Sequence, residues 1–308
     1  MFYVRMLAIQ CDGLHVRYPS KQKKTVFAVT DLTFQVEQGE IVGFIGPNGA
    51  GKSSTLKALM GFVEPNAGRC TVFGAPAGSI EARKSIGYLP EVAMYYPFLS
   101  PLETLMMYGE LQGLKGSKLR TEAFELLEQV GLKGAERVQN RTLSKGMMQR
   151  VGIAQSLLGN PKLLILDEVT SGLDPVGRKN LRDLLKEKHR NGTTLFFSSH
   201  ELGEISALCD RILFIHKGTM VEERNLVELE SSLRQFEVEF SGAVAMHDLA
   251  NEISESATGF RARFTSKDSL IQAIARLQSE GATVIDIVSQ EGSLEDYFVS
   301  TIEQQVAA

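Results

Sequence analysis

The sequence predicts an α/β fold, and three patterns in the 308-residue chain support this prediction. Through its middle, short apolar segments typical of buried strands alternate with amphipathic segments typical of helices, as in a sheet of parallel strands. Residues up to Ile45 instead alternate apolar and polar, which indicates antiparallel strands. After about Glu223, short alternating strands flank one amphipathic helix, which indicates a small α+β unit at the end of the chain.

The part of the chain before the first glycine-rich loop should form four strands, at residues 6–11, 15–18, 32–36 and 41–45. Residues 37–39 separate the last two strands, and Gly39 suits a tight turn that needs positive φ. We therefore expect the strands at 32–36 and 41–45 to form a hairpin.

The remainder of the chain should alternate helices and strands. Gly61 would end the first helix, and four consecutive aliphatic residues at 163–166 are typical of a parallel strand covered on both faces. The helices expected from apolar periodicity are 53–60, 101–130, 143–158, 178–188 and 201–209, and the expected strands are 163–166, 194–198 and 212–215. Beyond Glu223, strands are expected at 236–240, 260–264 and 283–288, and helices at 269–279 and 294–302.

Composition excludes several classes of protein. Hydrophobic residues make up 43% and charged residues 23% of the chain, so wholesale disorder is not expected. The net charge is −4 and no basic run stands out, so nucleic acid is not expected as a partner. No apolar stretch approaches the roughly 20 residues of a membrane-spanning helix, and the N-terminus does not resemble a secretory signal. The cysteines, Cys11, Cys70 and Cys209, lack metal-ligand spacing, and we expect buried thiols in a reducing cytoplasm.

The strongest local signal is the segment 46–53, which fits G-x-x-x-x-G-K-S and stands between a predicted strand and a predicted helix. Its glycines let backbone N–H groups turn inward around a polyphosphate, and the following helix adds the positive end of its dipole. Lys52 should reach the β- and γ-phosphates, Ser53 should ligate Mg²⁺, and Ser54 should contact the α-phosphate. The expected nucleotide-binding residues of this phosphate loop are Gly46, Pro47, Asn48, Gly49, Ala50, Gly51, Lys52, Ser53 and Ser54.

A second motif fits the first, because the apolar strand at 163–166 is followed directly by two acids. Asp167 is placed to hold Mg²⁺ through water. Glu168 is placed beside the γ-phosphate, where a carboxylate can polarise an attacking water.

At this point the sequence resembles an ABC-type ATPase, the nucleotide-binding subunit of a transporter. Residues 143–150, Leu-Ser-Lys-Gly-Met-Met-Gln-Arg, are similar to the family signature LSGGQ-x-QR and are called the signature segment below. Residues 171–174 resemble the D-loop, His200 matches the switch histidine, and Tyr18 is positioned like the aromatic residue that stacks on adenine. The resemblance spans residues 5–225 and includes a helical subdomain at about 92–158.

The resemblance implies a phosphate-loop NTPase core of ABC type, with an antiparallel β subdomain, a helical subdomain and a C-terminal α+β extension at 226–308. It implies ATP and Mg²⁺ as cofactors, and hydrolysis in which Lys52, Glu168 and His200 take part. Ser144 and Gly146 of one subunit would cap ATP held by a second ATP-binding subunit, so that two copies or two different cassettes share each site. The chain would power an exporter-type membrane transporter from the cytoplasmic face, through a polytopic permease.

The sequence departs from the family pattern at two motifs. Lys145 stands where glycine is commonest in the signature segment, and Met147 replaces glutamine. Residues 87–91 resemble the Q-loop, but Glu91 stands in place of glutamine and could contact Mg²⁺ or a water. Both variants occur in an exporter-type branch of the family, so neither indicates inactivation.

The sequence leaves alternatives open for two segments and for the function. The aromatic segment 92–99 could receive a helix of a membrane partner or could be a packed loop of the helical subdomain. The C-terminal extension could be a stabilising appendage, a dimerisation element or a contact for the permease. The main alternative function is a soluble ABC-type ATPase of DNA repair or translation, although those usually carry coiled-coil insertions or two cassettes. A phosphate-loop kinase or GTPase is disfavoured by the signature segment and by the lack of Asn-Lys-x-Asp.

Overall fold

The computed structural model describes residues 6–19, 25–199, 201–242, 244, 246, 248–256, 258–290 and 292–307. The chain divides into two compact units, Met1–Arg224 and Asn225–Ala308, and each is described by itself. Among the described residues, no helix is both long and apolar enough to cross a lipid bilayer.

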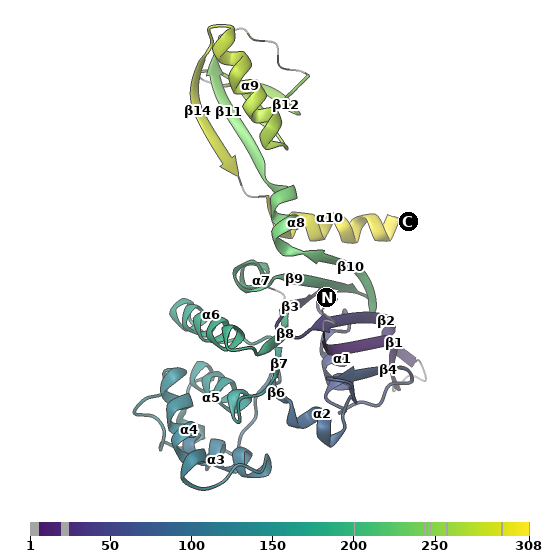
Figure 1. Cartoon of the computed structure of the whole chain (residues 1–308), viewed down its shortest axis with the longest axis vertical. Helices are drawn as coiled ribbons and strands as arrows, with labels where there is room; N and C mark the ends of the chain where they lie inside the picture. Colours follow the sequence, from purple (N-terminus) through teal and green to yellow (C-terminus); the bar gives the residue numbers. More distant parts are fainter. Residues whose placement is uncertain are drawn as a thin grey trace, which may run out of the picture. The chain divides into compact units, whose positions relative to one another are not determined.

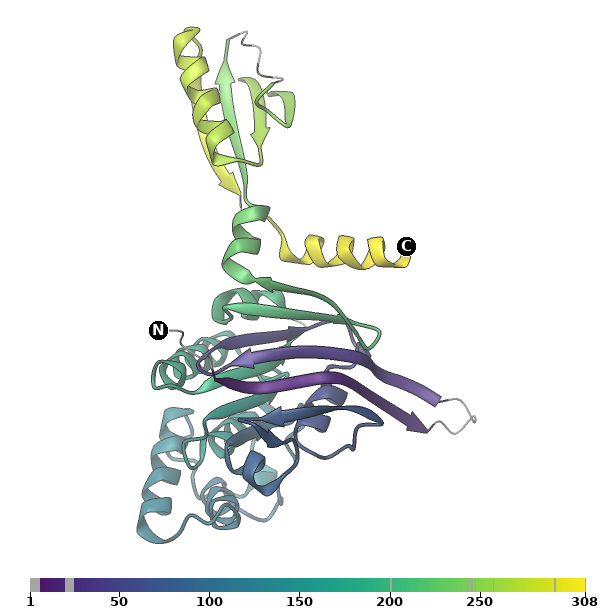
Figure 2. The same cartoon turned by 45° about the vertical axis from the view of Figure 1, so that its right-hand side comes forward.

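The first unit contains an antiparallel sheet of four strands in the order β2-β1-β4-β5, and Figure 2 shows its long strands curving side by side. The strands expected at 6–11 and 15–18 form one long strand, with a register shift between Cys11 and Leu14 where the two segments meet. The bounds are Leu7–Pro19 for β1, Thr25–Glu37 for β2, Ala67–Val72 for β4 and Ala75–Pro76 for β5.

The second sheet of this unit has six strands in the order β10-β9-β3-β8-β7-β6. The pairs of β3 with β8 and β9, and of β7 with β6 and β8, are all parallel. The carboxyl ends of these strands therefore meet at one edge, where α/β proteins place their ligands. The bounds are Ile41–Ile45 for β3, Ile86–Leu89 for β6, Leu163–Asp167 for β7, Thr194–Ser199 for β8, Arg211–His216 for β9 and Thr219–Asn225 for β10.

The prediction that the strands at 32–36 and 41–45 form a hairpin is wrong. Gly39 does adopt positive φ, 75°, but β2 pairs with β1 in the antiparallel sheet, whereas β3 joins the parallel sheet. All five residues of β3 are buried, because its apolar run needs cover on both faces. The turn at residues 38–40 therefore carries the chain from one sheet to the other.

Helices surround the parallel sheet, and α3, α4 and α5 group together as a helical subdomain (Figure 1). The helix expected at 101–130 is two helices, because the chain turns between them at Gly113, whose φ is 91°. The other expected helices of this unit are confirmed with small shifts. The bounds are Lys52–Leu59 for α1, Ile80–Lys84 for α2, Pro101–Leu111 for α3, Gly116–Gln129 for α4, Lys145–Leu157 for α5, Pro175–Arg190 for α6 and Leu202–Leu208 for α7.

Aromatic rings hold the two sheets of the first unit together. Phe34 on β2, Phe44 on β3 and Phe196 on β8 stack with ring centroids 5.4 to 6.0 Å apart, and all three are buried. Such stacked pairs add to the free energy gained by burying their apolar area. The antiparallel sheet is thereby fixed against the strand that leads into the phosphate loop.

The prediction of separate buried thiols is wrong for two of the three cysteines. Cys11 on β1 lies directly opposite Cys70 on β4, and a disulfide joins them. The two residues are 59 positions apart in the sequence, and only the pairing of β1 with β4 brings them together. Cys209 is a buried free cysteine, and burial raises the pKa of its thiol.

The second unit is a four-stranded sheet in the order β12-β13-β11-β14, and α9 packs against one of its faces. The buried residues between them include Val238, Phe240 and Phe264 from the strands and Leu270 and Leu277 from α9. The bounds are Leu226–Leu233 for α8, Gln235–Ser241 for β11, Glu252–Ser256 for β12, Gly259–Phe264 for β13, Lys267–Ser279 for α9, Thr283–Gln290 for β14 and Leu294–Ala307 for α10.

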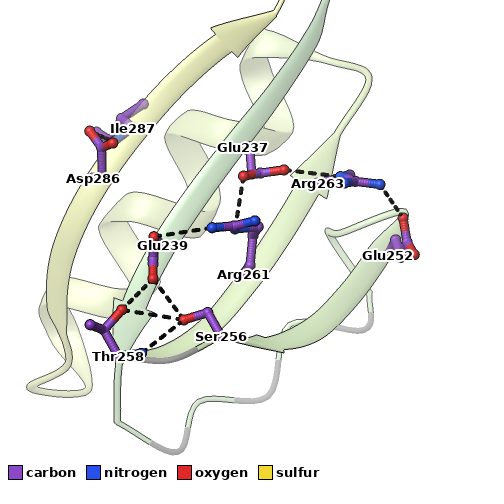
Figure 3. A network of polar contacts seen from close by, with 9 residues as sticks. All are labelled: Glu237, Glu239, Glu252, Ser256, Thr258, Arg261, Arg263, Asp286 and Ile287. Atoms are coloured by element: carbon purple, nitrogen blue, oxygen red, sulfur yellow. Dashed lines mark hydrogen bonds and ion pairs between the residues drawn. The ribbon is translucent and has the colours of Figure 1, made fainter.

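The other face of this sheet carries paired charges (Figure 3). Glu237 forms ion pairs with Arg261 at 2.9 Å and with Arg263 at 3.0 Å, and Arg263 also pairs with Glu252 at 2.9 Å. Hydrogen bonds donated by Thr258 and Ser256 lower the pKa of Glu239. Cross-strand charge pairs of this kind suit a solvated face, so the unit has one apolar and one polar side.

Candidate active site

The phosphate loop lies at the carboxyl edge of the parallel sheet, between β3 and α1. Gly51 caps α1 with φ of 111°, and a Cβ atom there would lie 2.4 Å from the carbonyl oxygen of Ala28. Only glycine fits this position, because both the left-handed backbone and the close approach exclude a side chain. The sequence pattern therefore predicts the loop's position correctly.

The first turn of α1 is open to an anion. No side chain caps this helix and no acidic residue lies in its first turn. By contrast, Ser100 forms a capping box at α3, and Asp174 accepts a hydrogen bond from the N–H of Gly177 at α6. The unpaired N–H groups and the helix dipole at the start of α1 favour bound phosphate.

A cavity of about 580 Å³ opens beside the phosphate loop, a volume typical of small-molecule sites. Its lining comes from five separate parts of the sequence and includes most of the residues expected to bind nucleotide. The residues that line it are Tyr18, Val26, Phe27, Ala28, Asn48, Gly49, Ala50, Gly51, Lys52, Ser53, Ser54, Glu91, Glu168 and Ser171.

Lys52 is the buried cation of the cavity. Its Nζ donates to the carbonyl oxygen of Gly46 at 2.6 Å, and lies 4.0 Å from Oε1 of Glu168. Burial lowers the pKa of the Lys52 ammonium below its ordinary value, while the carboxylates of Glu168, Asp167 and Glu91 oppose that shift. The loop thus keeps a buried positive charge at the wall of the cavity.

Asp167, the last residue of β7, and Glu168, which follows it, have different surroundings. Asp167 is buried, and its Oδ1 accepts a hydrogen bond from the hydroxyl of Ser198 on β8. Glu168 lines the cavity, and its backbone lies in the left-handed region with φ of 50°. The chain turns sharply here, so that the Glu168 side chain leaves the sheet edge and reaches the cavity.

The cavity also has an apolar end that sequence reasoning found only in part. Tyr18 on β1, the predicted adenine contact, lies opposite Val26 on β2, and both line the cavity. Phe27 lines it as well, and the guanidinium of Arg17 lies 4.7 Å from the centroid of its ring. The signal that would have found Val26 and Phe27 is the register of β1 against β2, which no local motif carries.

The signature segment opens α5 but does not line this cavity, within the part of the chain that the structure describes. Ser144 is the exposed N-cap of α5, and its Oγ accepts from the N–H of Met147 at 3.2 Å. A Cβ atom on Gly146 would lie 2.8 Å from the carbonyl oxygen of Gly172, and the stem of Lys145 lies against Gly172. The glycine at 146 is thus required by the D-loop of its own chain. His200 lies outside the described residues.

The comparisons with known proteins agree with this geometry. The family model "ABC transporter" matches residues 29–171. An uncharacterized ABC transporter ATP-binding protein of Synechocystis, sll0415, is 34% identical over 91% of this chain and 80% of its own length. The bacitracin transport ATP-binding protein BcrA of Bacillus licheniformis is 35% identical over 89% of this chain and 92% of its own length.

Among solved structures, the ATP-binding cassette MJ0796, in a dimeric post-hydrolysis state bound to ADP and Pi, superposes with a TM-score of 0.66. It is 23% identical and covers 71% of this chain and 98% of its own, which shows the shared fold. The predicted α/β fold of ABC type is confirmed, and an ATPase of DNA repair or translation is not favoured. The chain belongs to the ABC transporter family, as one of its ATP-binding, ATP-hydrolysing subunits.

Proposed function

We propose that residues 5–225 are the ATP-binding domain of an exporter, that 226–308 are an accessory extension, and that the chain works at the cytoplasmic face of the membrane. The observation that carries the ATPase assignment is the single cavity that gathers Tyr18, Lys52, Glu91 and Glu168 around the start of α1. The bacitracin transport relative supports a role in transport. The Lys145 and Glu91 variants support the exporter branch.

The cavity offers groups suited to the adenine, to the polyphosphate and to the attacking water. Tyr18 and its apolar neighbours would stack on adenine, and the phosphate loop with Lys52 would hold the polyphosphate. Ser53, Asp167 and Glu91 offer the hard oxygen ligands that Mg²⁺ prefers, and the ion would offset phosphate charge as the γ-phosphate leaves. Glu168 would orient and deprotonate the attacking water. A contact of His200 with the γ-phosphate stays a prediction.

The position of the signature segment supports a site shared between two subunits. Ser144 is exposed and stands outside the cavity of its own chain, so its hydroxyl and the start of α5 are available to a second subunit. The dimeric ADP-bound cassette of the same fold supports this arrangement. We infer that ATP is held between the phosphate loop of one subunit and Ser144 and Gly146 of the other.

Lys52→Ala should lower ATP affinity by about 10- to 100-fold, because it removes the one buried ammonium that lines the cavity in the described chain. Isothermal titration calorimetry with ATP would measure the loss. Lys57→Ala, on the exposed side of the same helix, is the matched control and should bind like the parent. Unchanged affinity in Lys52→Ala would reject the phosphate-loop assignment.

An exposed apolar surface near the cavity is our proposed contact for the permease. Val92, Met94, Tyr96 and Phe98 follow Glu91 in sequence and are 54 to 84% exposed. They lie in one connection between β6 and α3, anchored by hydrogen bonds from Asn140 to the carbonyl of Tyr96 and to Thr104. A surface of this kind on an ordered loop suits a short helix of a membrane partner.

Co-expression with a polytopic permease from the same organism tests the transport assignment. We expect the two proteins to purify together in detergent, and Met94→Glu to weaken that association at least about tenfold because it places a charge in an apolar contact. Ile271→Glu, at another exposed apolar residue, on α9, is the control for added charge. Equal association of Met94→Glu and the parent would contradict the proposed contact.

A further inference from the structure

The backbone around Glu168 is held in a conformation that this residue would not adopt unaided. Its φ of 50° is left-handed, a region that costs an ordinary side chain free energy. Two backbone hydrogen bonds hold the turn. The N–H of Glu168 donates to the carbonyl oxygen of Ser198 at 3.1 Å, and the N–H of Ser171 donates to the carbonyl oxygen of Glu168 at 3.0 Å. The direction of the Glu168 carboxylate therefore depends on what keeps this turn in place.

A side chain of α5 bonds directly to this turn. Gln149, on the second turn of α5, is 6% exposed, and its Nε2 donates to the carbonyl oxygen of Val169 at 2.9 Å. Val169 is itself buried and directly follows Glu168. A buried carbonyl that lacks a hydrogen-bond donor destabilises the folded chain. The bond from Gln149 therefore favours the left-handed turn over conformations that would move Val169 away.

Further contacts join α5 to the residues after the turn. Gly146 and the stem of Lys145 pack against Gly172. Arg150 directly follows Gln149, and its Nη2 lies 3.5 Å from Oδ1 of Asp174. The face of α5 that carries residues 145, 146, 149 and 150 thus contacts residues 169, 172 and 174, so the helix packs along the segment that follows Glu168.

We propose that Gln149 is a positioning residue for hydrolysis, which acts on Glu168 through the carbonyl of Val169. The inference rests on the proposed function, in which Glu168 is the general base. It extends that function, because α5 begins at Ser144. The N-terminus of α5 would contact the ATP bound by a second subunit. Through Gln149, the same helix would also position Glu168, the base that acts on the ATP bound by its own subunit.

The test is Gln149→Met in the full-length chain, since methionine keeps the length and volume of the side chain but cannot donate the bond. We expect kcat for ATP to fall about tenfold and the Kd for ATP to change less than about twofold, because a displaced base slows chemistry without touching the phosphate loop. Gln155→Met is the matched control: Gln155 lies on the same helix and accepts from the hydroxyl of Tyr95 at 3.2 Å, away from the turn. It should keep the parental kcat.

Gln149→Asn keeps an amide group at this position. It is the second test variant, in case Gln149→Met does not fold. Its side chain is one methylene too short for the bond, so kcat should fall as in Gln149→Met. Parental kcat in both Gln149 variants would overturn the proposal, and so would equal losses in Gln149→Met and Gln155→Met, which would indicate a general weakening of α5.

A double-variant cycle separates this proposal from the proposed function. If Gln149 acts through Glu168, adding Gln149→Met to Glu168→Gln should cause no further loss of the residual rate. Multiplying losses would overturn the positioning role while leaving Glu168 as the base. A parental rate in Glu168→Gln alone would instead reject the general base itself.

Discussion

Glu168→Gln should lower ATP hydrolysis by about 100-fold or more and leave ATP binding intact. Proton abstraction by a positioned base contributes roughly 10²- to 10⁴-fold, and an amide cannot accept the proton of water. The substitution keeps the shape of the side chain and removes one negative charge from the cavity that binds the polyphosphate. Binding should therefore be as strong as in the parent, or stronger.

This variant should also accumulate as an ATP-bound dimer, because hydrolysis would be the step that reopens the pair. Phosphate release measures the rate, and light scattering after gel filtration measures the dimer with and without ATP. Glu187→Gln, an exposed acid of α6, is the control and should behave like the parent. Parental hydrolysis in Glu168→Gln would contradict the general-base assignment.

The parts of the site that could be predicted from sequence are those built by short continuous segments. The phosphate loop needs glycine at position 51 because of its own φ and its own neighbour, and the pattern of residues 46–53 carries that requirement. The strand before Asp167 is similar: an apolar run followed by acids predicts both burial and direction.

The parts that could not be predicted depend on which distant strands pair. The choice of sheet for β3 depends on its pairing with β8 and β9, which lie about 150 to 170 residues later in the chain, and the turn before it resembles an ordinary hairpin turn. The same holds for the Cys11–Cys70 disulfide and for Val26 and Phe27, which reach the cavity through strand register. Local motifs record chemistry well and long-range pairing poorly.

Gly146 shows a further limit, because a motif can predict the residue and miss one of its reasons. The resemblance explains this glycine by a phosphate on another subunit. The structure adds a reason within the chain, since the carbonyl of Gly172 occupies the space a side chain would need. In the proposed dimer, a single position of the signature segment would thus serve both the shared ATP site and the packing of α5 on the D-loop.

Ser144→Arg should lower the rate of ATP hydrolysis by the dimer about 100-fold or more, while each subunit still binds ATP with parental affinity. Ser144 is exposed and outside its own cavity, so a longer side chain leaves the phosphate loop intact but blocks the approach of a second subunit's γ-phosphate. Calorimetry checks binding, and light scattering of Ser144→Arg in the Glu168→Gln background checks the ATP-bound dimer. Ser232→Arg, on α8, is the control for added charge.

Mixing two inactive variants gives the sharpest test of the shared site. Lys52→Ala lacks a working phosphate loop, and Ser144→Arg lacks a working signature segment. In a mixed dimer, one site combines the intact phosphate loop of the second variant with the intact Ser144 of the first, so hydrolysis should partly return. A site contained in one chain gives no such rescue, because neither variant carries both halves. A mixture as inactive as its components, although mixed dimers form, would therefore contradict the shared site and indicate that the phosphate loop and Ser144 of one chain act together.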